Sequence, residues 1–329
     1  MPDVYRNRSN GEYNIETISP FRVVFMGTPD FAVPSLQALH ESRHDVVLVV
    51  TQPDRPRGRG RKIMPSPVKE SAIRFGYELS QPENVKSEAF REVITGFKPD
   101  LLAVVAFGRV LPGRLLERPP LKAINVHASL LPKYRGPAPI QWAIINGEKE
   151  TGVTTMLMDE GLDTGDILLQ QSIPISPEDT AITLHDKLAR EGACLLLETL
   201  ENLTTGKLIP TAQDPTCATY VPMLKKKDGH INWERPAKDI ANFIRGINPW
   251  PGAFTFCGDT RLKIYKSKPL DKETHAAPGT VLMSFPDEIL VATSKGTLLI
   301  EELQGASGKC LLTKEYLCGC SMEAGTVLT

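Results

Sequence analysis

Two side chains that can handle protons and hydrogen bonds lie two residues apart near the middle of the chain. Asn125 lies in the apolar stretch 121–126, which predicts a short strand, and His127 directly follows it. Because side chains two apart on an extended backbone point to the same face, the amide and the imidazole should lie side by side where the strand ends. An amide can donate a hydrogen bond, and an imidazole can give or take a proton near neutral pH. The spacing favours a reactive site over a strand cap that carries a surface histidine.

The residues after His127 predict a loop on the ligand side of a sheet. Pro132 cannot pair within a strand, Gly136 turns the chain, and Pro137 suits the first turn of a helix that runs to about Asn146. In parallel α/β sheets, ligands collect in the crevice beyond the carboxyl ends of the strands. The loop would lie at that crevice.

Strands and helices alternate along the first two thirds of the chain, which predicts an α/β domain with a Rossmann-like, doubly wound and mostly parallel sheet. The turn at Gly27 lacks the Gly-x-Gly-x-x-Gly spacing of dinucleotide-binding domains, so NAD is not expected. The expected strands are 21–26, 45–51, 101–106, 121–126, 152–158 and 167–173, and the expected helices are 31–40, 66–75, 88–96, 137–146 and 177–204.

The last third of the chain has a different character. Residues 207–225 are rich in proline and threonine and predict a linker. Beyond it, Leu262 and Ile264 alternate with polar neighbours, so these two side chains should face inward. The pattern predicts a small OB-like β-barrel. Its expected elements are a helix at 236–244 and strands at 261–266, 279–283, 288–292 and 297–303.

The composition is that of a two-domain globular protein. A chain of 329 residues is too long for one ordinary α/β core, and 38 basic against 39 acidic residues give no overall charge that would attract a polyanion. No apolar run approaches the roughly 20 residues of a membrane helix. Residues 1–19 lack the apolar core of a secretory signal and predict a polar extension. We expect a cytoplasmic protein that does not bind membranes, and a monomer.

Neither the cysteines nor the acidic loop predicts a metal site. The six cysteines are scattered without a Cys-x-x-Cys pair, so reduced thiols are expected. The acidic segment 159–166 carries Thr164 where a calcium loop needs glycine, and the histidines lack zinc-binding spacing. We therefore expect no metal.

A basic segment follows the second expected strand. It also contains glycine and proline, so it predicts a mobile, positively charged loop. The planar fork of arginine suits phosphate, which favours a contact with nucleic-acid phosphates over a merely solvated surface. The basic residues are Arg55, Arg57, Arg59, Arg61 and Lys62.

Six short motifs spread along the chain are specific enough to suggest a family. They are Met-Gly-Thr-Pro-Asp-Phe at 26–31, Thr-Gln-Pro-Asp-Arg-Pro at 51–56, Met-Pro-Ser-Pro-Val-Lys at 64–69, Asn-Val-His-Ala-Ser-Leu-Leu-Pro at 125–132, Gly-Leu-Asp-Thr-Gly-Asp at 161–166 and Asn-Pro-Trp-Pro at 248–251. Together they resemble the folate-dependent formyltransferases, and in particular the branch of methionyl-tRNA formyltransferases. The similarity runs from about Phe21 to the end of the barrel; Ala128 stands where glycine is also common, and the tail from Cys310 departs from the pattern.

The resemblance implies an activity and a division of the chain. Members transfer the formyl group of 10-formyltetrahydrofolate to the α-amino group of methionine on initiator tRNA. By this resemblance, 20–206 is the formyltransferase catalytic domain, 207–225 the linker and 226–329 a barrel that binds tRNA.

Roles for individual residues follow from the same resemblance. Asn125 would donate to the tetrahedral oxyanion, His127 would shuttle the proton, and Asp163 would orient the imidazole and favour its protonated form. The folate would be lined by Ser129, Leu130, Leu131 and Pro132. The basic segment would attract the tRNA.

Three other functions are compatible with parts of the sequence. The same chemistry on a small amine would leave the basic segment and the barrel unexplained. A hydrolase that releases formate from formyl-folate needs only the same three catalytic residues. A catalytically idle RNA-binding protein would use the barrel and the basic segment, but an intact set of Asn125, His127 and Asp163 argues against it.

Overall fold

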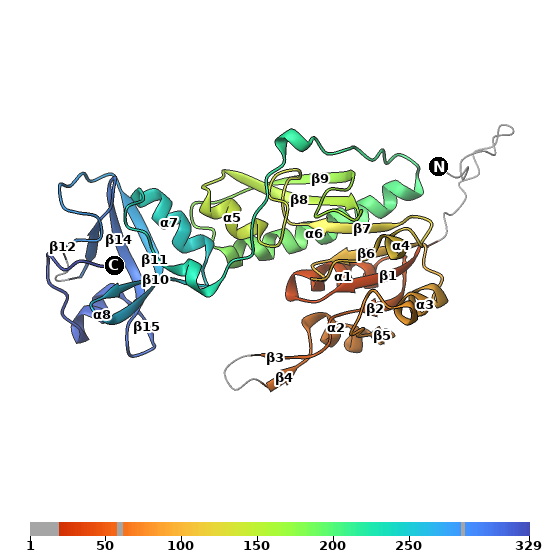
Figure 1. Cartoon of the computed structure of the whole chain (residues 1–329), viewed down its shortest axis with the longest axis horizontal. Helices are drawn as coiled ribbons and strands as arrows, with labels where there is room; N and C mark the ends of the chain where they lie inside the picture. The colour runs from red at the N-terminus through yellow and green to blue at the C-terminus, as the bar shows by residue number, and fades with distance from the viewer. Residues whose placement is uncertain (1–19, 58–61, 284–286) are drawn as a thin grey trace.

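A computed structural model describes residues 20–57, 62–283 and 287–329 of the chain. The expected extension at 1–19 and two of the five basic residues, Arg59 and Arg61, lie outside the described residues. An α/β part and a β-rich part lie end to end, with helices α5 (Pro139–Ile145) and α7 (Ala237–Gly246) between them (Figure 1).

The α/β part is built on a seven-stranded sheet in the order β5-β2-β1-β6-β7-β8-β9. The first five strands of this order run parallel, as expected, while β7 to β9 pair antiparallel. The antiparallel pairing of β8 with β9 follows from the short segment 158–166 between them, because a parallel crossover needs about a dozen residues or more. The strands are β1 (Arg22–Gly27), β2 (Asp45–Val50), β5 (Leu79–Ser80), β6 (Leu101–Val105), β7 (Ala123–His127), β8 (Glu150–Leu157) and β9 (Ile167–Pro174).

Helices cover both faces of this sheet, so β6 is apolar throughout and β1 is apolar after Arg22. In β1, Val23 and Phe25 pack into the core under α1 and α6, while Val24 and Met26 pack into the core under α3 and α4. The doubly wound fold predicted from the alternation of strands and helices is therefore confirmed. The helices are η1 (Asp30–Ala32), α1 (Val33–Glu41), α2 (Pro67–Phe75), α3 (Glu88–Gly96), α4 (Gly113–Leu116) and α6 (Ala181–Thr204).

Local capping explains where the helices begin. Ser66 accepts a hydrogen bond from the Lys69 backbone N–H at 3.0 Å and starts α2. The long helix α6 starts at Ala181 and not at the expected Pro177, because Thr180 and Thr183 form a reciprocal capping box there.

The β-rich part holds the second core. Its six-stranded antiparallel sheet has the order β10-β11-β14-β13-β12, with β15 paired to β14, and forms the expected small OB-like barrel. Leu262 and Ile264 are buried, at 0% and 2% exposure, as their alternation predicts. Its elements are η3 (Lys226–Gly229), β10 (Ala253–Cys257), β11 (Thr260–Leu270), β12 (Val281–Met283), β13 (Ile289–Ala292), β14 (Thr297–Gln304), β15 (Cys310–Leu312) and α8 (Thr313–Gly319).

The basic segment, predicted as a mobile, positively charged loop, has regular structure on both of its described sides. The described residues on its two sides form an antiparallel ribbon of β3 (Arg55–Arg57) and β4 (Lys62–Met64), which projects from the α/β part (Figure 1). Backbone pairing between the two short arms, which composition alone does not reveal, orders them.

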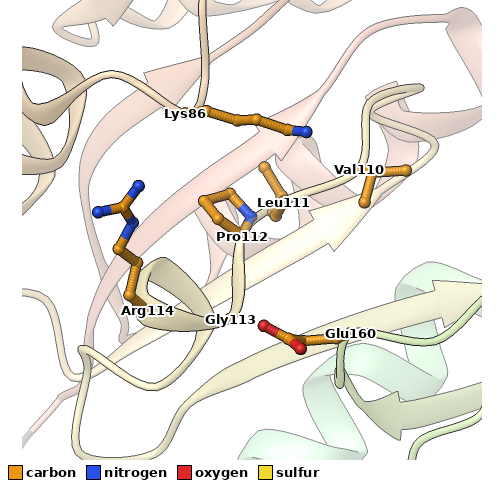
Figure 2. Close-up of a pocket in the computed structure, with 7 residues that line it drawn as sticks. All are labelled: Lys86, Val110, Leu111, Pro112, Gly113, Arg114 and Glu160. Carbon is orange, nitrogen blue, oxygen red and sulfur yellow. The ribbon is translucent and has the colours of Figure 1, made fainter.

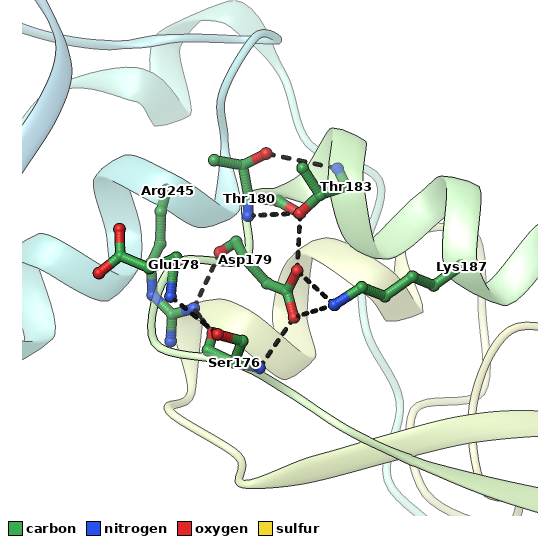
Figure 3. A network of polar contacts seen from close by, with 7 residues as sticks. All are labelled: Ser176, Glu178, Asp179, Thr180, Thr183, Lys187 and Arg245. Atoms are coloured by element: carbon green, nitrogen blue, oxygen red, sulfur yellow. Dashed lines mark hydrogen bonds and ion pairs between the residues drawn. The ribbon is translucent and has the colours of Figure 1, made fainter.

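The two parts are docked through polar and apolar contacts. Arg245 of α7 donates through Nη1 to the carbonyl oxygens of Ser176 and Asp179 at 3.1 and 2.9 Å (Figure 3). Both oxygens of the Asp179 carboxylate accept from Lys187 Nζ, at 2.8 and 2.9 Å. These bonds fix the loop to which Arg245 donates. On the apolar side, Ile145 of α5 belongs to the core of the barrel.

No helix within the described ranges is long and apolar enough to span a membrane.

We predict that Arg245→Met lowers the free energy of unfolding by about 1–3 kcal/mol, because the Asp179 carbonyl loses its donor in a buried position. Urea or thermal unfolding measures the change. Arg43→Met is the matched control: Arg43 pairs with Glu201 on the surface at 2.8 Å, and such exposed pairs contribute about 0–1 kcal/mol. Equal stability of the two variants would contradict a docking role for Arg245.

Candidate active site

Asn125 and His127 share one face of β7 at its carboxyl end. Ile124 and Val126 point into the core on the opposite face, which leaves the two polar side chains together. Asn125 is half-buried, and within the described part of the chain no hydrogen bond reaches its side-chain amide. The amide is therefore available to an incoming oxygen.

His127 is buried, and a polar group lies near each of its ring nitrogens. Nε2 lies 3.0 Å from the carbonyl oxygen of Tyr134, and Nδ1 lies 3.7 Å from Oδ1 of Asp163. Because a carbonyl oxygen only accepts, Nε2 carries the hydrogen of that bond. Nδ1 is too far from Asp163 for a direct hydrogen bond but close enough for ion pairing when it holds a proton.

Asp163 reaches the imidazole from the loop between β8 and β9. Its backbone is left-handed, with φ of 55°, and its Oδ2 accepts from the Gly136 N–H at 2.8 Å. Gly165 allows the tight turn beside it, because a Cβ there would lie 1.8 Å from the Leu157 carbonyl oxygen. The structure thus brings together a carboxylate and an imidazole that are far apart in the sequence.

The segment 129–132 forms a tightly bonded turn beside His127. Ser129 is fully buried and its Oγ donates to the Lys133 carbonyl at 2.6 Å. Thr154 Oγ1 donates to the Ser129 carbonyl at 2.7 Å and accepts from the Leu131 N–H at 3.2 Å. Ser129 and Leu131 therefore hold the shape of the turn, while Leu130 and Pro132 are partly exposed.

Tyr134 was not singled out from the sequence. Its left-handed backbone, with φ of 60°, turns its carbonyl toward His127, and its hydroxyl donates to Glu148 at 2.7 Å. Burial raises the pKa of the Tyr134 phenol to about 12, so the hydroxyl stays a donor. No spacing in the sequence indicates this role, because it depends on one backbone conformation.

A cavity of about 270 Å³ opens beside the loop that carries Asp163 (Figure 2). It combines apolar side chains with two cations and one carboxylate. Sequence reasoning missed it, because its wall comes from three separate segments without a shared motif. It is lined by Lys86, Val110, Leu111, Pro112, Gly113, Arg114 and Glu160.

The base of the basic ribbon is fixed to the α/β part. Asp54 accepts from Lys69 Nζ at 2.7 Å and from Gln81 Nε2 at 2.8 Å. Both hydrogen bonds lower the pKa of the Asp54 carboxyl, and the bond from Lys69 has the larger effect. Arg55 and Lys62 are exposed on the ribbon. The described ranges contain no group of three or more His, Cys, Asp or Glu side chains placed to hold a metal ion.

Comparison with known proteins agrees with this architecture. The Formyl transferase family model matches residues 21–200, and the model of the formyl transferase C-terminal domain matches residues 223–321. The methionyl-tRNA formyltransferase of Caldanaerobacter subterraneus subsp. tengcongensis is 52% identical over 308 residues, which cover 93% of this chain and 99% of that protein.

Two solved structures share the fold. An N-formyltransferase from Helicobacter canadensis, in complex with folinic acid and dTDP-3-aminofucose, superposes with a TM-score of 0.64 at 22% identity over 85% of this chain and 98% of its own. HypX from Aquifex aeolicus in complex with tetrahydrofolic acid gives a TM-score of 0.59 at 20% identity over 91% and 47%. With both domains matched and half of the residues identical to a full-length relative, this chain belongs to the methionyl-tRNA formyltransferase family of the formyl transferases.

Proposed function

We propose that this protein transfers the formyl group of 10-formyltetrahydrofolate to the α-amino group of methionine on initiator tRNA. The observation that carries the proposal is that His127 and Asp163 lie 3.7 Å apart at the end of β7, on the strand face that also carries Asn125, in a chain whose relatives are methionyl-tRNA formyltransferases. The product of this transfer is N-formylmethionyl-tRNA, which is used in translation initiation.

The reaction is an acyl transfer with a tetrahedral intermediate. The amine forms a bond to the formyl carbon, the carbonyl oxygen gains negative charge, and the bond to the folate nitrogen then breaks. The Asn125 amide has no hydrogen-bond partner among the described residues and lies on the ligand side of the sheet, so it supplies the donor for this oxygen.

The proton must move from the attacking amine to the leaving nitrogen. His127 is suited to carry it, because Nε2 is fixed on the Tyr134 carbonyl while Nδ1 faces Asp163 without a direct bond. A proton that arrives at Nδ1 forms an ion pair with Asp163. The carboxylate thereby stabilises the charged intermediate of the relay without itself exchanging the proton.

The formyl donor needs apolar and cationic contacts, because folate combines a flat heterocycle with carboxylates. The turn 129–132 supplies part of this surface, as the family resemblance implies. The cavity beside Glu160 is a candidate for another part, since Val110 and Leu111 are apolar and Lys86 and Arg114 can pair with carboxylates.

The acceptor is a polyanion, and the near-neutral chain as a whole offers it no attraction. The ribbon concentrates positive charge at one place on the α/β part, with Arg55 and Lys62 exposed. We propose that the ribbon contacts tRNA phosphates and that the barrel at 226–329 supplies a second contact surface.

A two-substrate assay tests the proposed function. Purified protein with 10-formyltetrahydrofolate is offered methionyl-initiator tRNA, glycinamide ribonucleotide, an amino-sugar nucleotide or water alone, and formyl transfer is followed by mass spectrometry. We expect transfer to the charged tRNA at a kcat/KM at least about a hundredfold above that of the small amines, in line with discrimination by specific polar contacts. Formate release without transfer, or equal transfer to small amines, would contradict the proposal.

We predict that Asn125→Ala lowers kcat by about a hundredfold to a thousandfold with little change in either KM, because one oxyanion donor is lost. Steady-state kinetics with both substrates measure this. Asn202→Ala, at a position on α6 away from β7, is the control and should keep kcat within about twofold. A matching loss in the control, or an unchanged kcat in the first variant, would rule out the oxyanion role.

We predict that neutralising the ribbon raises the KM for tRNA and flattens its dependence on salt, because fewer counterions are released on binding. The KM for folate should stay the same. The slope of log KM against log salt concentration is the readout, and an unchanged slope would exclude the phosphate contact. The variant replaces Arg55, Arg57, Arg59 and Arg61 with glutamine, and its charge-matched control replaces Arg43, Arg74, Arg91 and Arg190.

A further inference from the structure

One side chain from the segment between the two domains reaches into the active-site loops. Gln213 lies at 207–225, the segment predicted as a linker, and it belongs to none of the family motifs found in the sequence. Its Nε2 donates to the carbonyl oxygens of Asp163 at 2.9 Å and of Gly165 at 2.7 Å. The side chain therefore bridges two carbonyls of the loop that presents the catalytic carboxylate.

The other end of the same amide is fixed by a buried arginine. Gln213 Oε1 accepts from Nε and Nη2 of Arg135 at 3.1 and 2.8 Å, and Arg135 is only 4% exposed. Arg135 Nη1 donates to the Tyr220 hydroxyl at 2.7 Å. Because a guanidinium only donates, the Gln213 amide cannot be reversed without facing its NH₂ toward another donor. Its N–H groups are therefore directed at the Asp163 loop.

The linker also bonds to the backbone of the loop that follows His127. The Arg135 N–H donates to the Thr219 carbonyl at 2.8 Å, and the Val221 N–H donates to the Arg135 carbonyl at 2.9 Å. Thr219 Oγ1 accepts from the Tyr134 N–H at 2.8 Å. The same loop gives His127 its carbonyl partner and Asp163 its N–H partner. The linker thus supports both sides of the His127–Asp163 pair.

Asp163 needs this support because its backbone is left-handed. For a residue with a Cβ, that conformation is less favourable than right-handed backbone, although aspartate adopts it more readily than most residues. Within the part of the chain that the structure describes, one hydrogen bond fixes the direction of the carboxylate, the 2.8 Å bond from the Gly136 N–H. Without a donor for the Asp163 carbonyl, the loop can relax and the carboxylate can turn away from the imidazole.

We propose that Gln213, oriented by Arg135, is a positioning residue that holds the Asp163 carboxylate toward His127. It acts through Asp163 and touches no reacting atom. This inference rests on the proposed formyl transfer and deepens it, because it makes the segment between the domains a part of the active site.

The first test is Gln213→Leu, which keeps a side chain of similar size but removes both hydrogen-bonding ends. We expect kcat for formyl transfer to fall about tenfold to a hundredfold, the range expected when a catalytic group is misplaced by an ångström or less. The KM values for 10-formyltetrahydrofolate and for methionyl-tRNA should change by less than about threefold. Gln171→Leu, on the exposed edge strand β9, is the matched control and should retain the wild-type kcat.

A second variant and a double-mutant cycle separate positioning from folding. Gln213→Glu can still accept from Arg135 but cannot donate to the two carbonyls, so its kcat should also fall. This variant keeps the bond to Arg135, so it tests the lost donor even if Gln213→Leu folds poorly. In an Asp163→Ala background there is no carboxylate left to position, so Gln213→Leu should change kcat by less than about twofold.

Two results would overturn the inference. One is a wild-type kcat in both Gln213 variants. The other is an equal loss of kcat from Gln213→Leu with and without the Asp163 carboxylate. Because the wild-type protein is assayed first, failure of the proposed function would show as no formyl transfer by the wild type, which is distinct from full transfer by the variants.

Discussion

A backbone carbonyl directed at one nitrogen of an imidazole is the constraint on which the proposed active site depends. The Tyr134 carbonyl can lie 3.0 Å from His127 Nε2 only because Tyr134 adopts a left-handed backbone. Asp163, on the other side of the ring, has the same kind of backbone. Two non-glycine residues in this region are a cost that the surrounding structure must offset, and such residues are concentrated at functional sites. Here the offset comes from hydrogen bonds to Thr219, Glu148, Gly136 and Gln213.

Much of the fold followed from patterns that act over short distances. The helix α3 begins and ends where it was expected, and the alternation in β11 placed Leu262 and Ile264 inside. The period of two in an extended strand also put Asn125 and His127 on one face of β7. These features depend only on neighbouring residues, so sequence alone can predict them. The family assignment was confirmed as well, because its motifs are long and specific.

The features that were missed depend on contacts between distant segments. The antiparallel edge of the sheet and the ribbon β3–β4 are set by which strands meet. The start of α6 is the exception, because a local capping box sets it. The cavity beside Glu160 and the contacts of Gln213 join segments with no shared pattern. The residues proposed to do the chemistry were named from the sequence through a resemblance, whereas the contacts that hold them in place required coordinates.

The first matched family region ends at residue 200 and the second begins at residue 223. The stretch between them therefore belongs to neither family model. That stretch contains Gln213, Thr219 and Tyr220, all of which bond to the active-site loops. Anyone building a chimera from two relatives, with one supplying the barrel and the other the sheet, would have to join them after this stretch and not before it. A junction placed near residue 206 would keep the proposed catalytic residues of one relative, but the residues that bond to their loops would come from the other relative.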